Sequence, residues 1–193
     1  MDKPTESLYK NITLNDVQLA SAYYPILIDL AKNKQRMSYG ELVEKAKEIY
    51  PDKEYVQNAI AVSTGRKLDV VRIFASERAL PDVTSLIINK NQGECGTGFT
   101  NHFNPENARS EVYEYDWSGV SNDFDIYIQK AEKEVKPKAR LNRAQALIIM
   151  SSYYKENQVS LPSSIKEKRD EILTMLMEGI SAEDSFGLAM NRL

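Results

Sequence analysis

The stretch from Met37 to Phe99 constrains the fold more than any other part of the chain. Ser38 stands three residues before Glu41, the capping-box spacing in which each side chain satisfies a backbone N–H at a helix start. Apolar residues then recur at the spacing of one helical face: Leu42, Val43, Ala46 and Ile49. The pattern predicts a helix that begins after Ser38 and ends before Pro51, because proline disfavours helical geometry in the residue before it.

A short helix over 53–62 is predicted next. At Ser63 the chain either continues it as one bent helix or breaks and starts a new helix, and Leu80-Pro81 ends the helical stretch. A β-rich run follows, and the glycines of 93–98 supply a turn and a short return strand. Two helices followed by a hairpin describe a winged helix-turn-helix, which places its second helix in a DNA groove. We expect an α+β fold that is mainly helical, with a C-terminal helical bundle after this unit.

Three strings stand in this stretch: Ser38-Tyr39-Gly40-Glu41-Leu42, then Gly65-Arg66-Lys67-Leu68, then Leu80-Pro81 with the predicted strand after it. Together they resemble the DNA-binding half of the alkylguanine-DNA alkyltransferase and alkyltransferase-like family. The resemblance covers about a third of the chain and implies a winged-helix scaffold that binds DNA.

The catalytic features of that family are missing from this chain. The family carries Pro-Cys-His-Arg on the strand after Leu-Pro, where this chain has Thr84-Ser85-Leu86-Ile87. The family's arginine that wedges into the base stack, three residues before the matching glycine, is Val62 here. No catalytic triad, phosphate loop or metal-ligand spacing is found elsewhere. We therefore expect no enzyme activity and no cofactor.

Charge and cysteine usage limit the function classes. The formal net charge of −3 argues against a surface coated in DNA-binding charge, although it is compatible with a local basic face. The single cysteine, Cys95, has no histidine or acid at motif spacing, so we expect an inert or mildly reactive thiol. No apolar run approaches the roughly 18 residues of a membrane span, and the polar N-terminus is not a signal peptide. Cytoplasm is the expected location, without membrane binding.

Three parts are expected along the chain: a winged-helix domain at 1–99, an acidic linker or extra strand at 100–122, and a helical domain at 123–193. A first helix, capped by Asn15 or Asp16, bends at Pro25 or starts anew at Tyr24. The Glu111–Trp117 run alternates acidic or polar with aromatic residues, which predicts a strand with Trp117 in the core. Acidic residues of this middle segment form a solvated face rather than a calcium-type cluster.

The C-terminal part is predicted to be helical throughout, with helices near 124–136, 138–157 and 162–179 and a last turn capped by Ser181. Six basic residues lie between Lys130 and Arg143. They either contact phosphate or dock against the acidic segment 94–128. The methionines of the last two helices belong to the bundle core or to a dimer seam.

The preferred hypothesis is a non-catalytic DNA-binding protein, regulator-like or a phage or plasmid accessory factor. A helix N-terminus suits a phosphate, and the hairpin tip suits a wing that follows the DNA backbone. The plain alternatives are an N-cap with a solvated basic face and a solvated turn. The residues assigned to double-stranded DNA are Tyr39, Ser63, Thr64, Arg66, Lys67, Arg72, Lys90 and Asn91.

The alternative hypothesis is a protein-interaction module, such as a phage factor that binds and modulates a host complex without contacting DNA. It uses 123–193 to bind a host protein or a second copy of the chain. The net charge of −3 and the acidic midsection fit this hypothesis.

Overall fold

The computed structural model describes residues 8–9, 11–119, 123–135 and 141–191, and it divides into two units, 1–135 and 136–193. The division does not follow the predicted boundaries after residues 99 and 122. The segments 105–114 and 123–134 are both helices that belong to the first unit. The prediction of a mainly helical chain is confirmed.

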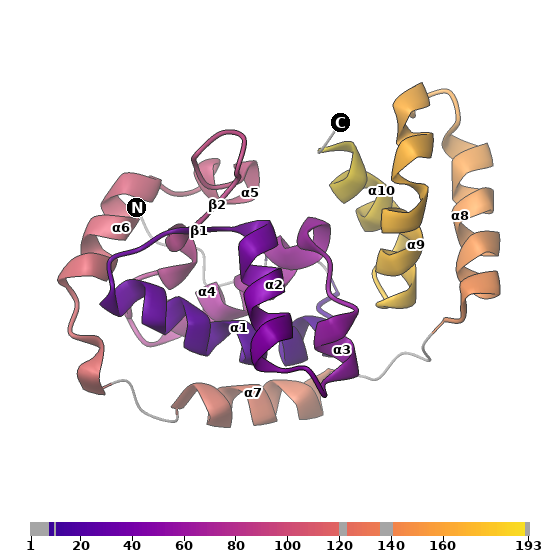
Figure 1. Ribbon diagram of the computed structural model, residues 1–193. Coiled ribbons are helices and arrows are strands. Elements are labelled where there is room, and N and C mark those ends of the chain that lie inside the picture. The colour runs from indigo at the N-terminus through magenta and orange to yellow at the C-terminus, as the bar shows by residue number, and fades with distance from the viewer. Residues whose placement is uncertain (1–7, 10, 120–122, 136–140, 192–193) are drawn as a thin grey trace. The chain divides into compact units, whose positions relative to one another are not determined.

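The first unit is organised around α1 (Leu14–Lys32), which is buried on nearly every side (Figure 1). Thr13 is its N-cap rather than Asn15 or Asp16: its hydroxyl accepts from the Asp16 N–H at 3.1 Å, and the Asp16 carboxylate accepts from the Thr13 N–H at 2.9 Å. This reciprocal pair is a capping box. The helix continues through Pro25, so no second helix starts at Tyr24.

Three further helical segments cover α1: α2 (Tyr39–Ile49), α3 (Glu54–Gln57) and α4 (Thr64–Glu77), the last preceded by a 3₁₀ turn, η1 (Ala61–Ser63). The capping box predicted at the start of α2 is confirmed. The Glu41 carboxylate accepts from the Ser38 N–H at 2.8 Å, and the Ser38 hydroxyl accepts from the Glu41 N–H at 3.3 Å. Ala79 takes a left-handed conformation (φ 52°) just after α4, which turns the chain before Pro81.

The structure does not confirm the wing. Where a strand was predicted, Val83–Leu86 form a 3₁₀ turn (η2), because the Asp82 carboxylate accepts from the Thr84 N–H at 3.1 Å. The only sheet in the described residues is the parallel pair β1 (Met37–Ser38) and β2 (Ile87–Ile88). A single antiparallel bridge joins Asn89 to Glu94, and the predicted return strand gives way to the short helix α5 (Thr97–Thr100).

The strand predicted at 111–117 is wrong, because the segment forms α6 (Pro105–Glu114) and the 3₁₀ turn η3 (Trp117–Gly119). Asn104 caps α6 by accepting from two backbone N–H groups at 3.0 Å, and proline stands at the helix start. These local signals outweigh the alternating pattern. Trp117 is buried as predicted, and its indole N–H donates to the Val112 carbonyl at 2.8 Å.

An aromatic cluster holds α7 (Asp123–Glu134) to the first unit. The rings of Tyr24 in α1 and Phe124 in α7 stack with centroids 3.9 Å apart, and Phe74 in α4 meets Phe124 edge-on at 4.8 Å. Such pairs add about 0.5–1.5 kcal/mol beyond area burial. The cluster explains why this helix does not belong with the C-terminal helices.

The second unit is a small helical bundle of α8 (Arg143–Asn157), the 3₁₀ segment η4 (Ser163–Lys168), α9 (Arg169–Met177) and α10 (Ala182–Met190) (Figure 1). Asn142 caps α8, which therefore starts later than the predicted Lys138; residues 136–140 lie outside the described residues. Gly179 ends α9 with a φ of 90°, and the Ser181 hydroxyl caps α10, both as predicted. None of the helices that the structure describes is long and apolar enough to cross a bilayer.

Candidate functional site

The predicted DNA-reading element is the N-terminal part of α4, and the structure buries it. Ser63 and Thr64 are fully buried. The Ser63 hydroxyl accepts from Lys67 Nζ at 2.7 Å, and the Thr64 hydroxyl donates to the Ile60 carbonyl at 3.3 Å. Both hydroxyl groups therefore contact atoms of the chain itself.

The two cations that follow form an interior cluster with Asp16 of α1. Arg66 and Lys67 are 0% and 1% exposed. The Asp16 carboxylate lies 3.1 Å from Arg66 Nη2 and 3.1 Å from Lys67 Nζ. Arg66 also donates to the Asn11 carbonyl at 2.6 Å, and its guanidinium lies 5.1 Å from the centre of the Tyr9 ring. The cations thus hold α4, α1 and the segment before α1 together.

The direction in which the pKa of Asp16 moves agrees with this pairing. Burial by itself would raise the pKa of the Asp16 carboxyl, but Lys67, Arg66 and the Thr13 N–H outweigh burial and hold that pKa below its ordinary value. One buried carboxylate therefore serves two buried cations. Removal of Asp16 leaves two cations in the interior without this carboxylate, whereas removal of one cation leaves a one-to-one pair.

Arg72 takes part in a second buried pair, one helical turn further along α4. Its guanidinium lies 2.8 Å from the Asp69 carboxylate, and both side chains are less than 5% exposed. Asp69 also accepts from the Leu8 N–H at 2.9 Å. The sequence predicted Arg66, Lys67 and Arg72 on an outward face; the structure places all three inside, because two carboxylates from the same unit bind them.

The remaining predicted DNA contacts are divided between interior and surface. Tyr39 is half-buried, and its hydroxyl accepts from the Gly96 N–H at 3.3 Å, which ties α2 to the chain before α5. Lys90 and Asn91 are exposed at the turn between Asn89 and Glu94. Of the eight assigned residues, only these last two present side chains to solvent as the hypothesis required.

The basic residues predicted to contact phosphate or the acidic segment 94–128 include two, Lys130 and Arg143, with ion-pair partners inside their own units. Lys130 lies 3.8 Å from Glu134 in its own helix, and Arg143 lies 3.0 Å from Asp170 in the second unit. Lys136, Lys138 and Arg140 lie outside the described residues.

Cys95 has the environment of a structural thiol. It is buried, and its S–H donates to the Ser85 carbonyl at 3.2 Å. Burial, with a smaller contribution from Asp82, raises the pKa of the Cys95 thiol to about 12. A thiol with this pKa is almost entirely protonated at neutral pH and is a poor nucleophile. Within the described residues, no group of three or more His, Cys, Asp or Glu side chains is placed to hold a metal ion.

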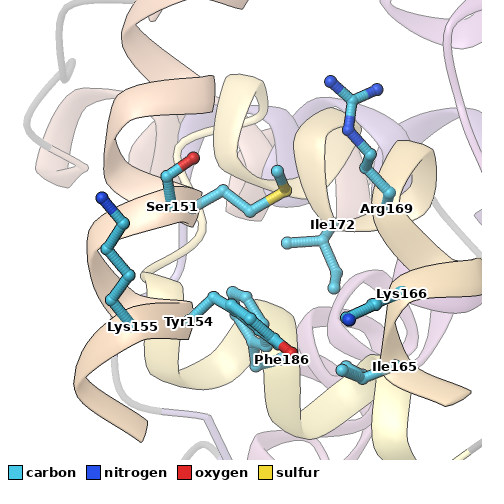
Figure 2. Close-up of a pocket in the computed structure, with 9 residues that line it drawn as sticks. Ser151, Tyr154, Lys155, Ile165, Lys166, Arg169, Ile172 and Phe186 are labelled. Atoms are coloured by element: carbon cyan, nitrogen blue, oxygen red, sulfur yellow. The ribbon is translucent and has the colours of Figure 1, made fainter. Parts of the chain in front are cut away.

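A pocket in the second unit is the feature that the sequence reasoning missed. Its volume is about 350 Å³, within the range of ligand-binding clefts. Figure 2 shows Ser151, Tyr154 and Lys155 of α8 on one side, and Ile165, Arg169 and Ile172 of η4 and α9 on the other. Met150, Lys166 and Phe186 complete the lining.

The sequence of α8 contains a run of consecutive apolar residues, Leu147, Ile148, Ile149 and Met150, of which Met150 lines the pocket. Four successive apolar residues point in four directions around a helix, and a small bundle covers only one side. Ile148 is accordingly 68% exposed, and Ala146 is the only buried residue of α8.

Comparison with known proteins gives no family for the chain: no protein-family model, no curated protein and no solved structure matches it.

Proposed function

We propose that the chain is a protein-interaction module whose second unit binds a partner polypeptide. The observation that carries this proposal is the open apolar pocket of about 350 Å³ between α8, η4, α9 and α10. Apolar concave sites with a few polar groups at their edges are the usual form of binding sites.

The interior position of the α4 cations favours this function over DNA reading. Affinity for DNA comes largely from cations that neutralise phosphates. Arg66, Lys67 and Arg72 are committed to Asp16 and Asp69, so phosphate contact by these side chains would require their ion pairs to break. Of the eight residues assigned to DNA, all of them described, Lys90 and Asn91 at the exposed turn are the two that still support DNA reading.

A peptide-display selection tests the proposal. The full chain is immobilised and exposed to random peptides of about 16 residues, a length that spans roughly four helical turns. We expect enriched peptides whose binding is lost with Ser151→Trp, because the indole occupies the pocket. Ser152→Trp is the matched control, since Ser152 is exposed on the same helix and does not line the pocket.

Two results would count against the proposal. One is the absence of any enriched peptide that distinguishes the two tryptophan variants. The other is tight binding of mixed-sequence duplex DNA at both low and moderate salt, weakened by Lys90→Glu, which would favour DNA reading. Charge reversal at Arg66 or Lys67 is unsuitable for this purpose, because it would place a carboxylate beside buried Asp16.

A further inference from the structure

The pocket in the second unit is a short groove with two helical walls. The α8 wall contributes Met150, Ser151, Tyr154 and Lys155, and the opposite wall contributes Ile165, Lys166, Arg169 and Ile172. Both sets follow helical spacing, so each wall is one face of a helical segment. In Figure 2, Tyr154 of the α8 wall and Lys166 of the opposite wall are directed toward one another. A wall from Ile165 to Ile172 is roughly 10–12 Å long, which matches about two turns of a partner helix.

The floor of the groove is apolar, and its rim is cationic. Ile165 and Ile172, at the base of the wall opposite α8, form the floor together with Phe186 of α10, and each is at most 2% exposed. Lys155 stands on the α8 wall, and Lys166 and Arg169 stand on the opposite wall. The lining includes no carboxylate.

The three cations of the rim differ in whether a nearby carboxylate already neutralises their charge. Arg169 lies 3.7 Å from Asp170, which also accepts from Arg143. By contrast, no described carboxylate lies within salt-bridge distance of Lys155 or Lys166. Lys166 Nζ is held 5.8 Å from the centre of the Tyr154 ring, so this contact crosses the groove from one wall to the other. A binding partner therefore meets positive charge on both sides of an apolar channel.

The charge of the second unit also differs in sign from that of the whole chain. Residues 136–193 contain nine Lys or Arg and seven Asp or Glu, a net charge of +2, whereas the full chain has −3. Four of these nine cations lie outside the described residues, and 141–191 carry five Lys or Arg against seven Asp or Glu. Attraction of an acidic partner therefore depends on the three cations that line the groove and not on the net charge of the unit.

We propose that this groove binds an acidic amphipathic helix of a partner protein, with two large apolar residues one turn apart on the floor and Asp or Glu residues beside both walls. Helix-in-groove recognition of this kind uses apolar anchors at i and i+3 or i+4. The inference rests on the proposed function and adds the shape and charge of the partner.

Two peptide libraries of identical apolar pattern test it against the full chain. One library carries Asp and Glu at the polar positions, and the other carries Lys and Arg. We expect enrichment from the acidic library only, and binding of its peptides that weakens as salt is raised. The triple variant Lys155→Glu, Lys166→Glu, Arg169→Glu should lower the affinity of those peptides at least about tenfold and shift enrichment to the basic library.

The control variant reverses three exposed lysines of the first unit, Lys32, Lys34 and Lys133, and changes the net charge by the same amount. It should leave peptide affinity unchanged. Equal enrichment from both libraries, or an equal loss in the control variant, overturns the inference. If the random library yields pocket-dependent peptides that are neutral or basic, the inference fails while the proposed function stands.

Light scattering of the purified chain tests a second copy as the occupant. A monomer at the concentrations of the binding assay agrees with the inference. A dimer that Ser151→Trp dissociates, while Ser152→Trp does not, would overturn it by assigning the groove to self-association.

Discussion

Replacement of Asp16 by asparagine tests whether one carboxylate compensates two buried cations. Asparagine has nearly the same shape and keeps an oxygen that accepts from the Thr13 N–H, so the cap of α1 is retained. The negative charge is lost, and Arg66 and Lys67 remain in the interior at 0% and 1% exposure. The variant therefore isolates the charge of Asp16 from its role at the helix start.

The expected cost is large. Breaking a buried ion pair by removing one partner costs about 3–5 kcal/mol, because the other charge stays buried without compensation. With a urea dependence of about 2 kcal/mol per molar, this loss moves the unfolding midpoint down by about 1.5–2.5 M. The triple variant Asp16→Leu, Arg66→Met, Lys67→Met removes all three charges and should be less destabilised than Asp16→Asn.

Urea unfolding followed by tryptophan fluorescence is the assay. Trp117 is the only tryptophan of the chain and is buried in the first unit, so the signal reports unfolding of the unit that contains the cluster. Asp29→Asn is the matched control: Asp29 lies on the same helix but is exposed, and its replacement should change stability by less than about 0.5 kcal/mol. If Asp16→Asn and Asp29→Asn shift the midpoint equally, the compensation argument is refuted.

Two further predictions concern titratable groups. The pKa of Asp16 is lowered in the folded state, so the stabilisation by its carboxylate is present above the unfolded pKa of about 3.9 and is lost as the pH falls further. The urea concentration at the unfolding midpoint should therefore decrease when the pH is lowered below about 4. This decrease should be smaller in Asp16→Asn. A midpoint equally pH-dependent in both proteins would contradict this. Burial raises the pKa of the Cys95 thiol to about 12. At pH 8 this thiol should therefore react with iodoacetamide about a thousandfold more slowly in the folded chain than in the urea-unfolded chain. Similar reaction rates in the two states would exclude a buried thiol.

Local sequence signals predicted the start or end of a helix correctly where its terminal backbone hydrogen bonds are made by residues close by in the chain. The capping box of Ser38 and Glu41, the glycine that ends α9 and the serine that caps α10 were all predicted and found. Each involves groups within a few residues, so no distant partner can alter it. Asn104 and Pro105 carried an equally local helix signal, which the alternating pattern of 111–117 obscured.

The wing was predicted from β propensity and glycine spacing, but a hairpin needs a paired return strand. Ile87 and Ile88 pair instead with Met37 and Ser38, about fifty residues earlier in the chain. Strand pairing is a tertiary choice, since a β-rich run exposes the same backbone groups to any partner. The sequence pattern therefore identified Ile87 and Ile88 as strand residues, but neither the 3₁₀ turn before them nor the strand that pairs with them.

In the candidate sites, too, the sequence determined the helices, and the tertiary structure decided which of their side chains are exposed. That α4 would be a helix with Arg66 and Lys67 near its start followed from the sequence by itself, because helical periodicity and caps are local properties of the chain. Whether those cations face solvent was decided by Asp16, fifty residues away, whose carboxylate makes their burial possible. The apolar groove was likewise decided by how η4, α9 and α10 cover α8, since a run of apolar residues does not specify which of them its neighbours leave exposed.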